Sequence, residues 1–260
     1  MSVWAKILEN LIIFASGITA LIFFIVGIDE YVLYHYYYLL ISAVSLAIIP
    51  VLCICNIITR KKLTKERAKK LKGYNVVIPC HYTSISKEAF KDNKDIVGVT
   101  IPRSIKKIGN DAFAGCSNLA RINIPYSVKI IGEFAFFDCN SLTDIDIPNS
   151  ITAIEKRVFW LCKNLKSVNI PDSVTNIGEF AFAVCQNLTN VNIPESVTNI
   201  GEGAFWNCKN LTIIHIPNFY TRIGTKTFYL CDKLTVHCRE NSDAHIYCKL
   251  NDIEFTFLES

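Results

Sequence analysis

The chain has 260 residues, of which 51% are hydrophobic, with a mean hydropathy of +0.29 and a formal net charge of +4 at pH 7. This composition is too apolar for an ordinary soluble domain of this length. The net charge comes largely from one basic block, and the remainder is balanced enough to argue against a polyanionic partner.

The apolar excess lies near the start of the chain, in two runs without charged residues. The first run covers residues 11–28 and the second covers about 36–58. Each is close to the roughly 20 residues that a helix needs to cross a hydrocarbon core of about 30 Å. We therefore predict a membrane region over 1–59, with two transmembrane helices at about 8–28 and 36–58.

Two other interpretations of these runs stay open, a cleaved signal peptide for the first and a buried core helix for the second. The residues between the runs favour the membrane interpretation. Asp29 and Glu30 form an acidic turn, and tyrosines, which are common at membrane interfaces, cluster beside it. These tyrosines are Tyr31, Tyr34, Tyr36, Tyr37 and Tyr38.

A basic juxtamembrane linker is predicted over 60–73. Its sequence RKKLTKERAKKLK contains eight basic residues and one acidic residue. Because Lys and Arg near helix ends stay on the cytoplasmic side, the linker predicts a cytoplasmic location for the rest of the chain. The block could also lie on anionic lipid. Binding to nucleic acid is less favoured, because no aromatic or Gly residues interleave with the charges.

The rest of the chain repeats with a period of 23 residues. Phe recurs in every repeat, and the dipeptide Ile-Pro precedes it at a fixed distance. A period of this length is typical of a solenoid, in which each repeat buries its apolar face against its neighbours. We predict a solenoid over 74–257, with atypical terminal repeats at 74–96 and 234–257 as caps. The Phe column comprises Phe90, Phe113, Phe136, Phe159, Phe182, Phe205 and Phe228.

Each column of the repeat has a predicted structural role. Leu-x-x-Val/Ile-x-Ile predicts one strand, and the following Pro should end its hydrogen bonding. A Gly column is expected to need a positive φ, although Glu155 replaces Gly in one repeat. The segment Gly-Glu-x-Ala-Phe is compatible with a short helix. The Gly column comprises Gly109, Gly132, Gly178, Gly201 and Gly224.

The 11 cysteines invite a redox or metal interpretation. Six of them, however, follow the Phe column by three residues, which predicts a buried ladder of reduced thiols with poor geometry for disulfides. The remaining zinc-type ligands lie near the C-terminus without a C-x-x-C spacing, so we predict neither a metal nor a cofactor. These ligands are Cys231, His237, Cys238, His245 and Cys248.

The repeats leave two sets of variable positions as candidate binding surfaces. One set should point outward from the strands and suits a protein or glycan partner, although a purely solvating role stays open. The strand set is Arg121, Asn123, Asp144, Asp146, Asn169, Asn190, Asn192 and His215, together with Ser167 and Ile213. The other set follows the Phe column and comprises the large aromatics Phe137, Trp160, Trp206 and Tyr229, with Ala114 and Ala183 between them. These aromatics could form a binding stripe or pack against neighbouring repeats.

The pattern I-P-x-S-V-x-x-I-G-x-x-A-F-x-x-C-x-x-L resembles the BspA-like leucine-rich repeat family over roughly residues 76–257. The resemblance implies a right-handed leucine-rich-repeat solenoid with one strand per coil, here preceded by the two predicted transmembrane helices. It also implies protein recognition, often at a cell surface. The family carries no catalytic residues, and no nucleophile elbow or phosphate loop is present, so we predict a non-enzymatic protein.

We predict a membrane-anchored module for protein–protein interaction, with a cytoplasmic solenoid and an unidentified protein partner. Neither nucleic acid nor a small-molecule substrate is expected. The alternative is an exported cell-surface adhesin, whose solenoid binds a host or extracellular protein or glycan.

Overall fold

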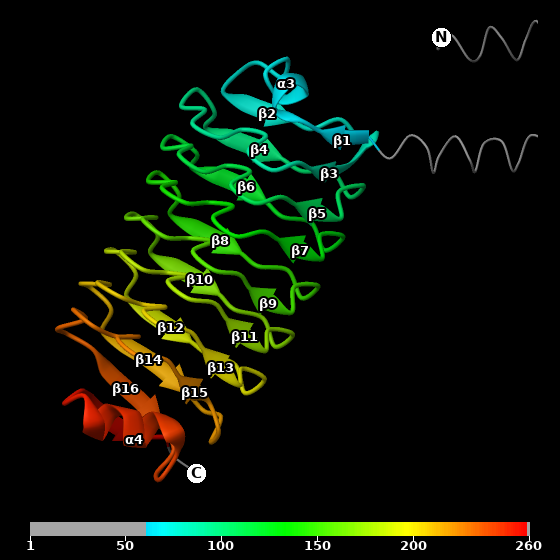
Figure 1. Cartoon of the computed structure of the whole chain (residues 1–260). Helices are drawn as coiled ribbons and strands as arrows, with labels where there is room; N and C mark the ends of the chain where they lie inside the picture. The colour runs from blue at the N-terminus through cyan, green and yellow to red at the C-terminus, as the bar shows by residue number, and fades with distance from the viewer. Residues whose placement is uncertain (1–60, 259–260) are drawn as a thin grey trace, which may run out of the picture. The chain divides into compact units, whose positions relative to one another are not determined.

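The computed structural model describes residues 61–258. The apolar runs expected to be transmembrane helices lie outside the described residues. Within 61–258, neither helix has the length and apolar character needed to cross a bilayer. The described residues form a stack of parallel coils (Figure 1), which confirms the predicted solenoid.

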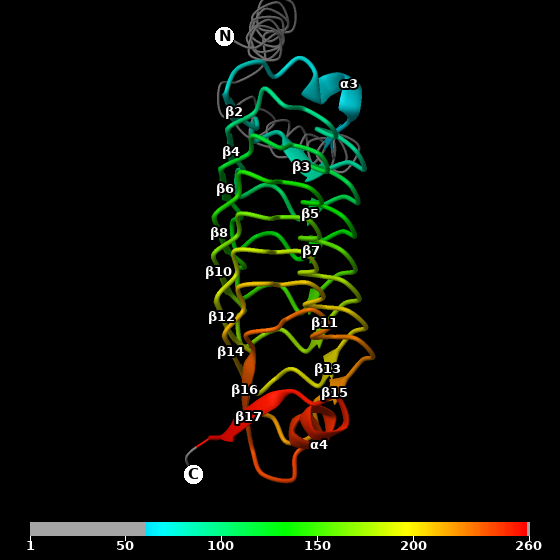
Figure 2. The ribbon, with the colours of Figure 1, turned by 90° about the vertical axis from the view of Figure 1, so that its left-hand side faces the viewer.

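Each full coil contributes two short strands, so the expectation of one strand per coil is wrong. The strands build two parallel ladders, which run along opposite sides of the stack (Figure 2). The even ladder contains β2 (Asn75–Val77), β4 (Gly98–Thr100), β6 (Arg121–Asn123), β8 (Asp144–Asp146), β10 (Ser167–Asn169), β12 (Asn190–Asn192), β14 (Ile213–Ile216), β16 (Thr235–Cys238) and, at its end, β17 (Glu254–Phe257).

The odd ladder is the one that the repeat pattern did not predict. It forms because the chain is extended again at the Ile of Ser-Val-x-x-Ile, where neighbouring coils lie in register. It contains β1 (Lys61–Leu63), β3 (Tyr82–Ile85), β5 (Lys107–Ile108), β7 (Ile130–Ile131), β9 (Ala153–Ile154), β11 (Asn176–Ile177), β13 (Asn199–Ile200) and β15 (Arg222–Ile223).

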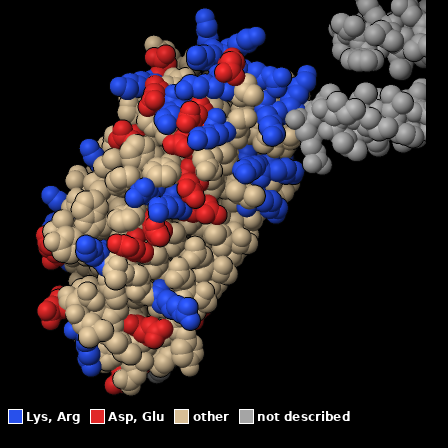
Figure 3. Space-filling view, viewed as in Figure 1, with Lys and Arg blue, Asp and Glu red and all other residues tan. Residues whose placement is uncertain are grey.

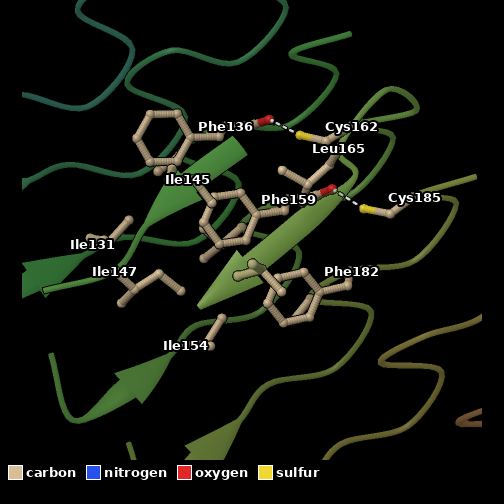
Figure 4. Packing of buried hydrophobic residues seen from close by; sticks show 14 of the residues in the cluster. Ile131, Phe136, Ile145, Ile147, Ile154, Phe159, Cys162, Leu165, Phe182 and Cys185 are labelled. Carbon is tan, nitrogen blue, oxygen red and sulfur yellow. Dashed lines mark hydrogen bonds between the residues drawn. The ribbon is translucent and has the colours of Figure 1, made fainter. Parts of the chain in front are cut away.

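The Phe column forms the centre of the core. Neighbouring rings stack with centroid separations between 5.1 Å and 5.9 Å along the whole column. Each thiol of the Cys column donates to the carbonyl oxygen of the preceding coil's Phe, as Cys162 does to Phe136 at 3.1 Å (Figure 4). Phe113, Phe136, Phe182 and Phe205 are fully buried, and each buried ring contributes about 3 kcal/mol of transfer free energy at most.

The Gly column is required by close approach, and not by positive φ as expected. A Cβ added to Gly178 would lie 2.7 Å from the backbone N of Lys156 in the preceding coil. Positive φ occurs two residues later, as at Arg157 and Phe180. The segment expected to be compatible with a helix is a run of turns. In it, Phe113 N donates to Ala135 O of the next coil and Cys116 N donates to Phe113 O.

Glu155 interrupts this arrangement. The column glycines donate to the carbonyl of the preceding coil, as Gly178 N does to Ile154 O at 2.7 Å, but Glu155 makes no such bond. Both ladders are interrupted at this coil, between β6 and β8 and between β7 and β9. The even ladder is also interrupted between β10 and β12. Ser86, the first residue in the column, keeps its bond to Leu63 O beside β1, where the register is irregular.

The two ends of the stack are closed by atypical elements. Residues 61–71, expected to lie in a linker, begin the solenoid with β1 and the helix α3 (Lys65–Ala68), and they bury Leu63 and Ala68. At the other end, α4 (Asp243–Leu250) and β17 cover the last coil. Ser242 caps α4 by accepting a hydrogen bond from His245 N.

Candidate protein-binding surfaces

The outward face of the even ladder carries the predicted strand set. Side chains alternate along each strand, so the central residue of β8, β10 and β12 enters the core and its two neighbours face solvent. Seven predicted positions are exposed and His215 is half-buried. The exposed positions are Arg121, Asn123, Asp144, Asp146, Asn169, Asn190 and Asn192.

The parallel register places equivalent positions side by side across this face. Asp144 lies beside Ser167, whose hydroxyl donates to its carboxylate at 2.8 Å. This hydrogen bond lowers the pKa of Asp144, and a side-chain hydrogen bond with Thr143 lowers it further by a smaller amount. The carboxylate therefore stays charged at neutral pH. The face is therefore a polar row with a fixed negative charge near its middle.

A shallow hollow of about 490 Å³ lies at the first interruption of the even ladder. Gly98 and Ala120 line it and supply almost no side chain, while Arg121 and Asp144 bring opposite charges to it. The two charged residues are among the predicted strand positions, but the hollow was not predicted. The available signal was the small size of Gly98 in a column where the next four coils carry polar side chains.

A pair of histidines marks the C-terminal end of the same face. His215 and His237 occupy paired positions on β14 and β16, and their rings stack with centroids 4.6 Å apart and planes at 9°. Burial lowers the pKa of His215, and the nearby His237 lowers it further by a smaller electrostatic effect. The predicted strand set extends from charged residues at β6 and β8 to this aromatic pair.

The predicted aromatic stripe is only partly exposed. Phe137, Trp160 and Trp206 are half-buried, and Tyr229 is 55% exposed. Trp160 packs on Phe137 with ring centroids 5.2 Å apart, so these two aromatics contact each other across neighbouring coils. Ala114 and Ala183, the small members of the column, are buried.

A guanidinium that was not predicted lies beside Trp160 of this stripe. The Arg157 carbon Cζ lies 5.4 Å from the ring centroid of Phe134, 4.9 Å from that of Trp160 and 5.3 Å from that of Phe180. A cation over aromatic faces is attracted by their quadrupoles. The repeat position two residues after Gly placed these groups in one column, and the mixture of Phe and Arg there was the available signal.

The remaining polar clusters have structural roles. Burial raises the pKa of Cys116 and Cys162 to about 12, so both thiols are protonated and unreactive at neutral pH. In the C-terminal cap, His245 packs between Phe255 and Phe257, and its Nδ1 accepts from Asn241 N at 2.9 Å. Across residues 61–258, no three His, Cys, Asp or Glu side chains are placed to hold a metal ion.

Comparison with known proteins agrees with this architecture. The family model described as BspA type leucine rich repeat region matches residues 68–182 and 152–256. A crystal structure of a T. pallidum leucine-rich repeat protein is similar with 30% identity and a TM-score of 0.60, over 72% of this chain and 86% of that one. No curated protein matches the chain.

A second similar structure is a leucine-rich cell surface protein from Faecalibacterium prausnitzii. It is 36% identical with a TM-score of 0.60, over 66% of this chain and 48% of that one. The present chain thus spans about half the length of that protein. The family match extends over the whole stack of coils and includes the Phe, Cys and Gly columns described above. This chain belongs to the BspA-type leucine-rich repeat family.

Proposed function

We propose that this chain is a membrane-anchored recognition module that binds a protein partner through the outward face of its even ladder. The observation that carries the proposal is the contrast between constant and variable columns. The Phe, Cys and Leu columns are buried and nearly constant, whereas the column that begins the even strands varies and is exposed in its four middle members. It reads Gly98, Arg121, Asp144, Ser167, Asn190 and Ile213. Repeat solenoids use such extended surfaces for binding.

The first interruption of the even ladder is the best anchoring point on this face. There the hollow offers depth, and Arg121 and Asp144 offer opposite charges that can pair with a partner. Charged groups around a depression give orientation and specificity, while the flat polar rows beyond it supply complementarity. The aromatic stripe is a weaker candidate because Trp160 packs on Arg157 and on Phe137, and Trp206 is half-buried.

Membrane anchoring is supported by the two apolar runs, and a cytoplasmic solenoid by the basic residues that follow them. A second candidate is an exported cell-surface adhesin. It is favoured by the similarity to the F. prausnitzii protein, which is described as a cell surface protein. Protease treatment of intact cells separates these proposals, because only an exported solenoid would be digested.

The binding face is tested with two matched pairs of substitutions in the full chain. Asp144→Lys with Asn190→Lys alters the even ladder, and Asn176→Lys with Asn199→Lys alters the odd ladder. A protein captured by the unmodified chain in cells should be lost from the first variant and retained by the second. Equal capture by both variants, with both folded, would contradict the proposed face.

A further inference from the structure

Basic side chains are unevenly distributed along the solenoid. Residues 61–132 contain fifteen basic and five acidic side chains, whereas residues 133–258 contain ten basic and fourteen acidic ones. The division falls where both ladders are interrupted. The overall balance of the repeats therefore hides a basic N-terminal part and an acidic remainder.

The odd ladder gathers part of this basic charge onto one face. Lys62 pairs with Ser84, Ser84 with Lys107, and Lys107 with Ile130, so these positions form one row across β1, β3, β5 and β7. Lys106 and Lys129 precede the strand pairs in consecutive coils, and the backbone N of Lys129 donates to the carbonyl of Lys106 at 2.9 Å. We call Lys61, Lys62, Lys106, Lys107 and Lys129 the lysine ladder; all five are exposed.

Three coils that follow lack this charge at the same positions. Where the early coils have Lys106 and Lys107, these coils have the pairs Thr152-Ala153, Thr175-Asn176 and Thr198-Asn199, and a basic residue returns only at Arg222 in the next coil. Figure 3 shows basic side chains gathered over β1, β5 and β7, followed by an uncharged surface over β9, β11 and β13. The lysine ladder is thus a local addition to the scaffold.

Within residues 61–258, no acidic side chain forms an ion pair with these lysines. The ion pairs found within residues 61–258 use Lys87, Lys91, Lys156 and Arg239, and none of them includes a member of the lysine ladder. Unpaired like charges on neighbouring strands repel one another and lower stability. A row of this kind is therefore better explained by an anionic partner than by a contribution to folding.

Apolar side chains accompany the lysines. Ile130, which follows Lys129, is 47% exposed, and Tyr126 is 64% exposed with the Arg103 guanidinium 5.3 Å above its ring. Tyr and basic residues together are characteristic of the headgroup region of membranes. Nucleic acid is less favoured, because the described part of the chain places no row of aromatic rings beside the lysines for bases to stack on.

We propose that the lysine ladder binds the surface of a bilayer that contains anionic phospholipid. The lysines supply charge complementary to the headgroups, and Tyr126 and Ile130 supply partial insertion. Along the chain, only Thr59 and Arg60 separate the second apolar run from β1, where the ladder begins. The inference deepens the proposed membrane anchoring, and it rests on that anchoring for the closeness of the lysine ladder to the bilayer. Because the two ladders lie on opposite sides of the stack, contact through the odd ladder leaves the even ladder free.

The test is amine labelling of the full chain in nanodiscs, with each lysine quantified by mass spectrometry. Nanodiscs of phosphatidylcholine are compared with nanodiscs that contain about 30% phosphatidylserine, whose charge gives the bilayer a negative surface potential. Lys106, Lys107 and Lys129 should be labelled several-fold more slowly with phosphatidylserine, and Lys163, Lys166 and Lys209 at equal rates. High salt should remove the protection, because the Debye length falls to about 3 Å at 1 M.

Matched variants localise the effect. K106T/K107N/K129T introduces residue types that later coils carry at these positions, and it should return the labelling of Lys62 to the phosphatidylcholine rate. K163N/K166T/K209N removes the same charge elsewhere and should leave the protection intact. Each lysine near an anionic surface is worth roughly fivefold in affinity, so the loss should be large. Circular dichroism confirms that both variants are folded.

Three outcomes would overturn the inference: equal labelling in both lipids, protection that survives in K106T/K107N/K129T, or protection by RNA but not by phosphatidylserine. Failure of the proposed anchoring gives a different result, because the chain would then not copurify with nanodiscs of phosphatidylcholine alone. In that case the same labelling, carried out with preformed vesicles, still decides whether the lysine ladder binds anionic lipid.

Discussion

The coils before and after Glu155 share one core but differ in how their backbones join. Phe136 and Phe159 stack across this point at 5.6 Å with their planes at 3°, much as rings do elsewhere in the column. Both strand ladders are nevertheless interrupted there, while β9, β11, β13 and β15 form a continuous ladder beyond it. Side-chain stacking and backbone pairing are therefore separable in this solenoid, and the odd ladder is interrupted at the coil where Glu155 replaces the column glycine.

The largest expected effect tests the shared core. Phe182→Ala should lower the free energy of unfolding by about 3–5 kcal/mol, because its ring is fully buried between Phe159 and Phe205, each with its centroid 5.3 Å away. Phe159→Ala, beside the interruption, should cost a similar amount within about 1 kcal/mol. Chemical denaturation measures both. A much smaller loss for Phe159 would show that the core also weakens where the ladders stop.

A smaller loss of stability is expected when a side chain is introduced into the glycine column. Gly178→Ala should cost about 1–3 kcal/mol, because its new Cβ would lie 2.7 Å from Lys156 N and force neighbouring coils apart. Glu155→Ala is the control, since this position already carries a side chain, and it should change stability by less than about 0.5 kcal/mol. Equal losses in the two variants, measured by thermal unfolding, would contradict the role assigned to the glycines.

The reverse change, from Glu to Gly, should restore backbone pairing between β7 and β9. Glu155→Gly removes the obstructing side chain and allows its backbone N to donate to Ile131 O, as the column glycines do to the preceding coil. A new hydrogen bond contributes about 1 kcal/mol and the added chain entropy of Gly offsets most of it, so the net stability should change little. Amide exchange at residues 153–155 should slow clearly. Unchanged exchange there would mean that another feature separates β7 from β9.

These effects also show what the sequence could predict. The period and the buried Ile, Phe, Cys and Leu columns identify the solenoid, because a fixed residue type at a fixed phase stacks on its own copies. The odd ladder was missed because a strand of two residues has too little alternation to be recognised. The prediction of a positive φ for the column glycines was wrong. A close approach between coils and a left-handed turn both favour Gly, and only the three-dimensional structure separates the two causes.

The candidate surfaces were predicted less completely. The outward positions from Arg121 to Asn192 follow from strand alternation, and they are exposed. The grouping of Phe134, Arg157 and Phe180, and the row joining Lys62 to Lys107, depend on contacts between coils. Charge balance over all repeats argued against an anionic partner, because an average along the chain cannot show which lysines share one face.

The smallest expected effect concerns pH and belongs to the C-terminal region alone. Because burial and His237 lower the pKa of His215, the unfolded state binds more protons below its ordinary pKa of about 6.5. Stability should therefore decrease slightly as pH falls from about 6.5 toward the lower folded-state pKa of His215. His215→Asn, the residue type at Asn192 on the neighbouring strand, should flatten this dependence. An unchanged pH profile of the melting temperature would exclude His215 as its source.

The central claim is that specificity lies in the variable outward positions of the even ladder. A photoreactive amino acid placed singly at Asn192 on β12, or at Asn199 on β13 as the matched control, tests it most directly in the full chain in cells. We expect a discrete crosslinked protein from position 192 and none from position 199. Crosslinking to the same protein from position 199 alone would contradict the claim and assign recognition to the odd ladder.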